Sequence, residues 1–233
     1  MRIIGVIVLL FIANSAIAQY LNTGNDPGYI KWKQIKNNDF QIIFPEGSEK
    51  NAKRVADALS HFYLSGARSL DHYPGKISVV LHTHTVVSNG MVSWAPRRME
   101  LYTTPNQAMS PMDWLDQLIV HEYRHVVQMD KIDTELPQLI RYLFGEHASA
   151  LVTGLYLPFW FLEGDAVVTE SVLTPSGRGR TPSFLMLTKA QVIENGLFSY
   201  DKATLGSYKS FVPDKYHFGY WFLSESRDRK SVV

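Results

Sequence analysis

Residues 111–129, PMDWLDQLIVHEYRHVVQM, contain the pentapeptide HEYRH, which runs from His121 to His125. Ser110 and Pro111 predict a helix that begins at Pro111 with Ser110 as its cap. On such a helix His121 and His125 leave the same face one turn apart, so both imidazoles can reach a single metal ion. The alternative is a helix with two hydrogen-bonded histidines that bind no metal.

A second segment, residues 160–166 (WFLEGDA), offers a carboxylate for the same ion. A catalytic zinc ion takes three protein ligands and keeps one position for water. Glu163 is the candidate for the third ligand, and Asp165 or Glu170 is the next in line. Glu170 lies two turns after Glu163 on the same helix face, where it can orient a ligand through a hydrogen bond. Taken alone, Glu163 would be read as a surface carboxylate near a helix start.

Together the two segments resemble the gluzincin metallopeptidases, in which HExxH is followed by a helix bearing W-[LF]-x-E-G-x-A and a later Glu. The resemblance implies one Zn²⁺ ion, held by His121, His125 and Glu163. It also implies that Glu122, which follows the first histidine, is the general base and not a ligand.

The resemblance extends over most of residues 29–222. The gap between the two metal motifs is longer than in aminopeptidase N-like members, which implies an inserted hairpin or helix over residues 137–157. The chain is more similar to peptidase domains of secreted bacterial proteins, often fused to a downstream β-propeller. In those domains a Gly-Arg-Gly-Arg segment follows the second motif, as residues 176–180 (SGRGR) do here.

The family also implies how the oxyanion and the substrate are bound. In aminopeptidase N-like enzymes a Tyr in a Y-x-x-G sequence donates a hydrogen bond to the oxyanion, and Tyr216 in YHFG has this form. Tyr208 and Tyr220 are the alternative candidates for this role. An edge strand before HExxH binds the substrate main chain in the same family, and residues 90–94 or 98–102 are the candidates.

Hydrophobic periodicity predicts an α+β fold in two parts. The first half reads as a small mixed sheet with one covering helix, from strands at 39–44 and 76–82, β-rich residues 90–103 and a helix at 49–70. The second half reads as mainly helical, with segments at 137–157, 158–171, 183–195 and 216–226. We expect a thermolysin/gluzincin-like arrangement, with the zinc site in the cleft between the two parts. The apolar residues 148–161 are too few for a membrane span and are expected to be core.

Composition narrows the class of protein. The 233 residues suffice for one domain or two small lobes, and 45% hydrophobic with 19% charged residues indicates a globular chain. A formal net charge of +1 gives no electrostatic reason to expect a nucleic-acid partner. There is no cysteine, so any metal ion must be held by nitrogen and oxygen.

Residues 1–18 have the pattern of a signal peptide. Arg2 provides the positive start, residues 3–12 form a short apolar core, and residues 16–18 (AIA) form a cleavage site. The apolar run is short for a membrane anchor, which is the alternative. We expect cleavage between Ala18 and Gln19, no later membrane span, and a secreted or periplasmic protein.

The C-terminal residues predict a truncated gene product. The peptidase domain is expected to cover residues 19–227, and residues 228–233 (DRKSVV) to be a non-native tail. These six residues are what a common sequencing adapter encodes before a stop codon. A downstream β-propeller would then be missing. The alternative is an ordinary polar tail.

The sequence therefore predicts a secreted zinc metallopeptidase that acts on a peptide or protein substrate, with Glu122 as base and Tyr216 as oxyanion donor. Two alternatives stay open. One is a gluzincin-fold binding or scaffold module that has lost turnover, and the other is a zinc hydrolase with a non-peptide substrate. The intact Glu122 favours an enzyme, because a binding module has no need of a base.

Overall fold

The computed structural model describes residues 26–107 and 111–230. The chain forms two compact units, Met1–Ile30 and Lys31–Val233, and every element below belongs to the second. The expected signal peptide, Ser110 and the last three residues of the expected tail lie outside the described residues.

The first half is a five-stranded mixed sheet, as predicted, with the strand order β1-β2-β3-β5-β4. Its strands are β1 (Trp32–Lys36), β2 (Phe40–Pro45), β3 (Ile77–His82), β4 (Gly90–Trp94) and β5 (Arg97–Tyr102). The central pairs β2–β3 and β3–β5 are parallel, and the outer pairs β1–β2 and β4–β5 are antiparallel. The sequence did not predict β1, because this edge strand is exposed on both faces and has no apolar alternation.

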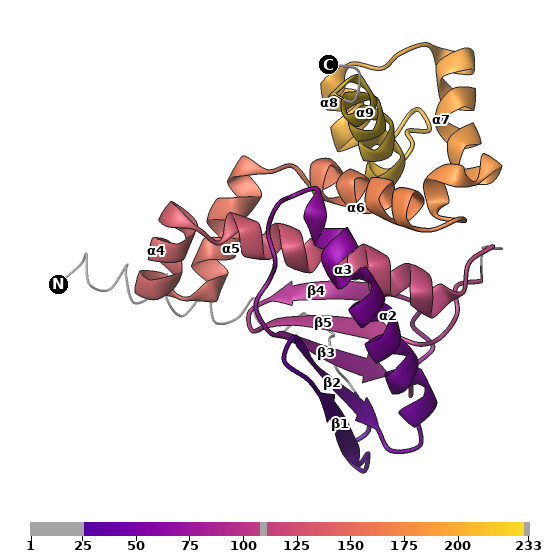
Figure 1. Ribbon diagram of the computed structural model, residues 1–233. Coiled ribbons are helices and arrows are strands. Elements are labelled where there is room, and N and C mark those ends of the chain that lie inside the picture. The colour runs from indigo at the N-terminus through magenta and orange to yellow at the C-terminus, as the bar shows by residue number, and fades with distance from the viewer. Residues whose placement is uncertain (1–25, 108–110, 231–233) are drawn as a thin grey trace. The chain divides into compact units, whose positions relative to one another are not determined.

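Two helices lie side by side on one face of this sheet, α2 (Glu49–Arg68) and α3 (Trp114–Ile132) (Figure 1). The helix α2 buries one apolar stripe, Ala52, Val55 and Leu59. The core between the helices and the sheet is formed mainly by branched and aromatic side chains, including Ile42, Val79, Leu101, Ile119 and Tyr123. The α+β fold is therefore held by one apolar layer, and α3 forms part of it.

The helix α3 begins later than predicted. Asp113 is its N-cap, with extended backbone (ψ 134°) and a side chain that accepts a hydrogen bond from the Leu115 N–H. The prediction of Pro111 as first helical residue was wrong, and Asp113 holds the capping position that the sequence assigned to Ser110. Asp113 is itself a strong capping residue, and its side chain satisfies an N–H that would otherwise lack a partner.

The second half is helical, as predicted, and its helices are α4 (Glu135–Phe144), α5 (Glu146–Tyr156), α6 (Phe159–Leu173), α7 (Pro182–Asn195), α8 (Tyr200–Leu205) and α9 (Lys215–Lys230). A short 3₁₀ turn, η2 (Arg178–Arg180), lies in the expected loop. The helix α6 packs between α3 and α9. Helix α9 extends past the predicted end at 226, so the first residues of the expected tail continue it.

The expected insertion is a helical hairpin, α4–α5, that turns at Gly145 with a positive φ of 87°. The prediction that residues 148–161 form core was wrong. Leu151 and Leu155 of α5 are 69% and 79% exposed, because α5 packs mainly on α4 and makes only a small contact with β4. Phe159 at the start of α6 is also 69% exposed. Among the described residues, no single helix is long and apolar enough to cross a membrane, and one pair bent by 90°, Glu146–Leu155 with Phe159–Leu173, meets that test by length and composition.

A buried ion pair connects α3 to its neighbours. Arg124 has no exposed surface. Its Nε and Nη2 donate to the two carboxylate oxygens of Asp165 on α6, at 2.5 and 3.1 Å, and its Nη1 donates to the Gly66 carbonyl of α2 at 2.7 Å. Arg227 of α9 pairs with the same Asp165. One carboxylate thus joins three helices.

Replacing Arg124 by alanine should lower the free energy of unfolding by about 3–5 kcal/mol, because it leaves a buried carboxylate short of its main partner. Urea unfolding measures the loss. Arg54→Ala is the matched control: its guanidinium also contacts both oxygens of an aspartate, Asp116, but is 44% exposed. That change should cost no more than about 1 kcal/mol. Equal losses in the two variants would contradict the role assigned to the buried pair.

Candidate metal centre

His121 and His125 of α3 and Glu163 of α6 converge on one point. The two Nε2 atoms lie 3.2 Å apart, and each lies 3.2 Å from Oε2 of Glu163. A tetrahedral zinc ion with ligands at about 2.0–2.1 Å would hold them about 3.3–3.4 Å apart. Within residues 26–107 and 111–230, this is the one group of three His, Asp or Glu side chains with metal-binding spacing. His125 and Glu163 are partly exposed, so the group opens toward solvent.

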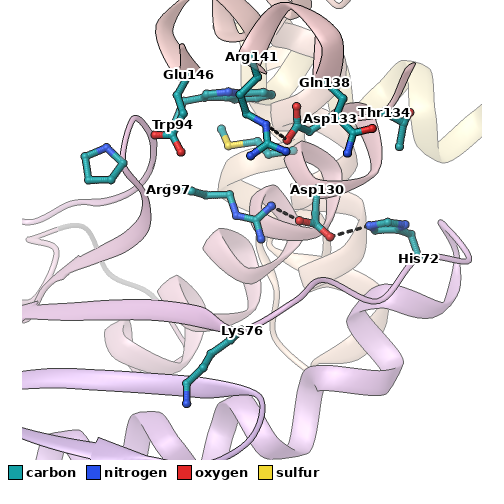
Figure 2. A pocket seen from close by; sticks show the side chains of 12 residues that line it. His72, Lys76, Trp94, Arg97, Asp130, Asp133, Thr134, Gln138, Arg141 and Glu146 are labelled. Carbon is teal, nitrogen blue, oxygen red and sulfur yellow. Dashed lines mark hydrogen bonds and ion pairs between the residues drawn. The ribbon is translucent and has the colours of Figure 1, made fainter. Parts of the chain in front are cut away.

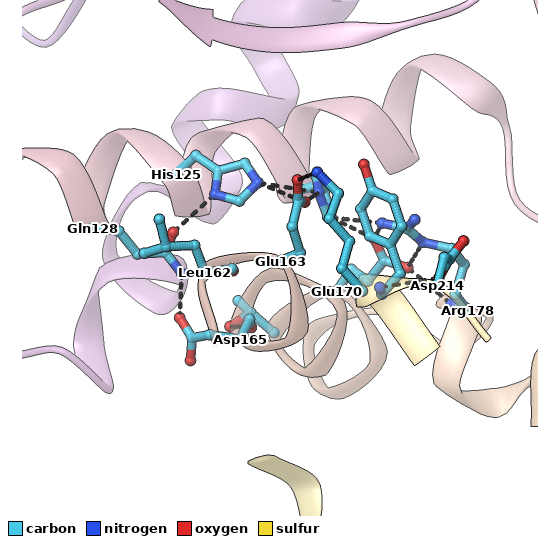
Figure 3. Close-up of polar contacts among 12 residues, drawn as sticks. His125, Gln128, Leu162, Glu163, Asp165, Glu170, Arg178 and Asp214 are labelled. Carbon is cyan, nitrogen blue, oxygen red and sulfur yellow. Dashed lines mark hydrogen bonds and ion pairs between the residues drawn. The ribbon is translucent and has the colours of Figure 1, made fainter. Parts of the chain in front are cut away.

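The protonation of His125 follows from its neighbour Gln128. The Gln128 amide nitrogen donates to the Leu162 carbonyl at 3.0 Å and to Asp165 at 2.7 Å, which fixes its orientation. Its Oε1 therefore faces Nδ1 of His125 at 2.8 Å, and Nδ1 must be the donor. In the neutral ring, Nε2 then carries a lone pair directed at the triangle (Figure 3).

His121 is oriented in the same way by Glu170, whose Oε2 lies 3.1 Å from Nδ1. Arg178 of η2 holds Glu170 with its backbone N–H and its guanidinium, at 2.7–3.0 Å. Burial alone would raise the pKa of Glu170, but the Arg178 charge and the bonds from His121 and Arg178 lower the pKa to about 2. Nη2 of Arg178 also lies 2.6 Å from Nδ1 of His121, so this nitrogen has two neighbours. Only a proton on Nδ1, donated to Glu170, leaves Nε2 free for a metal ion.

The third candidate ligand also has a polar partner. Lys215 at the start of α9 donates to Oε1 of Glu163 at 2.7 Å, which leaves Oε2 for the triangle. Burial would raise the pKa of Glu163, but bonds from His121 and His125 lower the pKa well below its usual range. When both rings are neutral and carry their proton on Nδ1, the triangle consists of three electron-pair donors, whereas a proton on either Nε2 would be donated to Oε2 of Glu163 instead. Its equal edges match the spacing of ligands around a single cation.

Glu122 lies beside the triangle and outside it. Its side chain is buried, and burial raises the pKa of its carboxyl group while the His121 and His125 charges oppose the rise. A Cβ atom at Gly90 would lie 2.8 Å from the Cγ and Oε1 of Glu122, so the start of β4 passes against this carboxylate. A carboxyl group with a raised pKa next to a metal-binding triangle has the environment of a proton acceptor.

The sheet edge nearest the triangle is β4, since β5 is paired on both sides. Of the two predicted edge strands, residues 90–94 are therefore at the edge, and the prediction of residues 98–102 was wrong. Strand order depends on long-range pairing, which neighbouring residues do not specify. The five residues of β4 are all partly exposed.

The three tyrosines proposed as oxyanion donors have different surroundings. The Tyr216 ring lies 6.0 Å from the His121 ring, centroid to centroid, and 4.9 Å from the Arg178 guanidinium. Tyr208 is fully exposed, and the Tyr220 hydroxyl donates to the Gly179 carbonyl at 3.1 Å. Burial raises the pKa of Tyr216, so its phenol stays protonated and can donate. Of these three tyrosines, only Tyr216 lies next to the triangle.

Two glycines determine where Tyr216 lies. At Gly219 an added Cβ would lie 2.0 Å from the Trp160 carbonyl, and at Gly164 it would lie 2.2 Å from the Gly219 backbone. The helices α6 and α9 therefore cross in backbone contact next to Glu163. Gly219 of the Y-x-x-G sequence packs on Gly164, which directly follows Glu163. Tyr216 lies one turn before Gly219 on α9.

Gly219→Ala should lower the free energy of unfolding by at least about 2 kcal/mol, because the new methyl group must push α9 away from α6. Thermal or urea unfolding measures the change. Gly154→Ala on α5 is the control, since a Cβ there meets no atom within 4 Å. It should be neutral or stabilising by up to about 1 kcal/mol. If Gly219→Ala were equally harmless, the helix crossing would not be as tight as described.

A separate polar cavity of about 620 Å³ lies at the other end of α3 (Figure 2). There Asp130 pairs with Arg97 and, at 2.8 Å, with Nε2 of His72, while Asp133 pairs with Arg141 at 2.9 Å. None of its lining residues belongs to the metal-binding triangle. Two of its carboxylates, Asp130 and Asp133, are thus engaged by arginine side chains.

Sequence reasoning selected His121, His125, Glu163, Glu122, Glu170 and Tyr216, and the structure brings all six together. It missed Gln128, Lys215 and the role of Arg178. The position of Gln128, three residues after His125 on the same helix face, was a usable signal. Lys215 and Arg178 reach the site through tertiary packing alone.

Comparison of the chain with models of known protein families finds no match, and a search of curated proteins finds no relative.

Proposed function

We propose that this chain is a zinc-dependent peptidase of the gluzincin type, with one Zn²⁺ ion held by His121, His125 and Glu163. The observation that carries the proposal is the triangle of three electron-pair donors with 3.2 Å edges, beside a buried carboxylate. The nitrogen and oxygen donor set suits zinc, and one open position matches a catalytic site. The α+β architecture, with a mixed sheet followed by helices, is compatible with a thermolysin-like fold.

His121, His125 and Glu163 would hold the zinc ion, which would supply a Lewis acid for polarising a carbonyl group and for activating water near neutral pH. Glu122 accepts the proton of the attacking water on its carboxylate and returns it to the leaving amine. The raised pKa of this buried carboxyl group supports that role, because a base works best when its pKa lies near the working pH. Gln128 holds His125 in the required tautomer, and Glu170 provides the acceptor for the Nδ1 proton that His121 needs in order to bind the ion.

Tyr216 is the proposed oxyanion donor. Its phenol is protonated, partly buried and next to His121, and the Arg178 guanidinium lies against its ring. A donor fixed by packing before the reaction stabilises developing negative charge without having to reorganise.

The free edge of β4 favours a peptide over other substrates of zinc hydrolases. An extended peptide can add to an unpaired strand edge through main-chain hydrogen bonds. This edge starts at Gly90, against Glu122, so a peptide bound along it would pass the proposed base. A gluzincin-fold binding module would also offer this edge, but it would gain nothing from burying Glu122.

His121→Ala, His125→Ala and Glu163→Ala should each reduce zinc content to well below one ion per chain, because each removes one of three ligands. Glu170→Ala keeps the ligands and should weaken zinc affinity by about 10–100-fold. Mass spectrometry of metal content after chelation and reloading measures both effects. If Glu163→Ala bound zinc as the wild type does, the third ligand would lie elsewhere.

The control for these variants is Glu122→Gln, which should retain zinc and lose turnover because it removes the base and no ligand. Turnover is measured by digestion of a mixed peptide pool, with cleavage sites read by mass spectrometry. Activity above a few per cent of wild type would contradict Glu122 as base. A zinc-loaded wild type that cleaves no peptide would favour the binding module or a non-peptide hydrolase.

Tyr216→Phe should lower kcat by about 10²–10³ with little change in KM or zinc content, since one oxyanion donor is lost in the transition state. Steady-state kinetics on a peptide found in the digest tests this. Tyr220→Phe is the matched control, because its hydroxyl contacts the Gly179 carbonyl and should leave kcat nearly unchanged. If Tyr220→Phe lowered kcat and Tyr216→Phe did not, the Y-x-x-G match would be a coincidence.

A further inference from the structure

A cavity of about 550 Å³ lies between the start of α6, the helix α8 and the start of α9. Most of its lining is aromatic or aliphatic, and the residues are Pro158, Phe159, Trp160, Tyr200, Ala203, Thr204, Leu205, Lys215 and Phe218. No metal motif includes any of the α8 residues. The α8 residues of its lining, Tyr200, Ala203, Thr204 and Leu205, have no part in the proposed chemistry.

This cavity adjoins the proposed zinc site through Lys215. The Lys215 ammonium group lines the cavity and lies 2.7 Å from Oε1 of Glu163. It also lies 5.4 Å from the centroid of the Phe159 ring. Phe159 precedes Glu163 by four residues of α6, a rise of about 6 Å along the axis. The part of the lining formed by Phe159 and Lys215 therefore lies about one turn from the third candidate ligand.

The aromatic walls are held in place by one another. The Trp160 indole N–H donates to the Tyr200 hydroxyl at 3.0 Å. The Trp160 ring meets the Phe218 ring edge to face, with 5.3 Å between centroids. Yet Phe159, Tyr200 and Leu205 remain exposed to solvent. A concave, pre-formed group of exposed aromatic side chains is typical of a site for an apolar ligand group.

The charges at the cavity further limit the kinds of ligand that it can bind. A cationic side chain would lose its hydration in this cavity, and no acidic residue lines the cavity to pair with it. The Lys215 ammonium group is already paired with Glu163, and Lys215 is the only charged residue among those that line the cavity. An acidic side chain would therefore lose its hydration among aromatic rings without gaining a free partner.

We propose that this cavity is the specificity pocket of the peptidase and takes a large apolar side chain, preferably aromatic, of the peptide substrate. The proposal rests on the proposed function. An extended peptide advances about 3.3–3.4 Å per residue, so the side chain belongs to a residue within one or two positions of the cleaved bond.

Matched peptides that differ only at that residue test the pocket. The zinc-loaded full chain should cleave the peptide with Phe at least about tenfold faster, in kcat/KM, than those with Asp or Lys. Ala203→Trp fills the cavity and should reduce this preference to less than about threefold without changing zinc content. Asp201→Trp adds the same bulk to α8 at an exposed residue that does not line the cavity, and it should keep the preference.

Binding of N-acetyl-phenylalanine amide, followed by NMR, separates this proposal from the proposed function because it requires no turnover. The compound should bind the wild type and Asp201→Trp, and bind Ala203→Trp at least about tenfold more weakly. If no peptide is cleaved but this pattern holds, the pocket stands and the peptidase assignment fails.

Three results would overturn the pocket: cleavage without preference for apolar residues, a preference that survives Ala203→Trp, or absence of both cleavage and binding. Self-association of the wild type that Ala203→Trp abolishes would also overturn it, because the cavity would then be occupied by a second copy. Should Ala203→Trp fail to fold by circular dichroism, Thr204→Phe fills the same cavity and takes its place.

Discussion

The ion pair between Arg124 and Asp165 joins the two helices that carry the candidate ligands. Arg124 directly precedes His125 on α3, and Asp165 follows Glu163 by two residues on α6. Both side chains are buried, so moving α3 away from α6 would leave each charge without its partner in a low-dielectric interior. Asp165 also accepts from Gln128, which holds His125. The interaction that holds the helices together therefore also orients one of the histidines.

The third helix of the site, α9, is positioned by a steric constraint. Gly164 and Gly219 bring the backbones of α6 and α9 into contact, which a side chain at either position would prevent. Through this crossing α9 delivers Lys215 to Glu163 and Tyr216 to His121. Arg178 fills the space between Glu170 and Tyr216. The three candidate ligands thus have polar partners on three helices, Gln128 on α3, Glu170 on α6 and Lys215 on α9.

Burying Glu122 is unfavourable, because a carboxylate loses its hydration there and its pKa rises. Structural packing alone does not explain such a residue, since an apolar side chain would fill the same space at lower cost. The proposed proton transfer would explain it, because a raised pKa brings the carboxyl group closer to the pH at which a base must accept and release a proton. Under the proposed function, the same environment weakens the fold locally and favours turnover.

The sequence by itself determined which residues share a helix face. The four-residue spacing of His121 and His125 and the seven-residue spacing of Glu163 and Glu170 depend only on helical periodicity, and alternating apolar residues identified most strands. Tertiary structure alone decided which sheet edge is free, that residues 148–161 are exposed, and that Tyr216 rather than Tyr208 or Tyr220 reaches His121. Tertiary structure also placed Lys215 against Glu163, which precedes it by 52 residues, and Arg178 against His121, which precedes it by 57 residues. The physical reason is that periodicity acts over one or two helical turns, whereas these contacts depend on how α6 and α9 cross and on which strands pair.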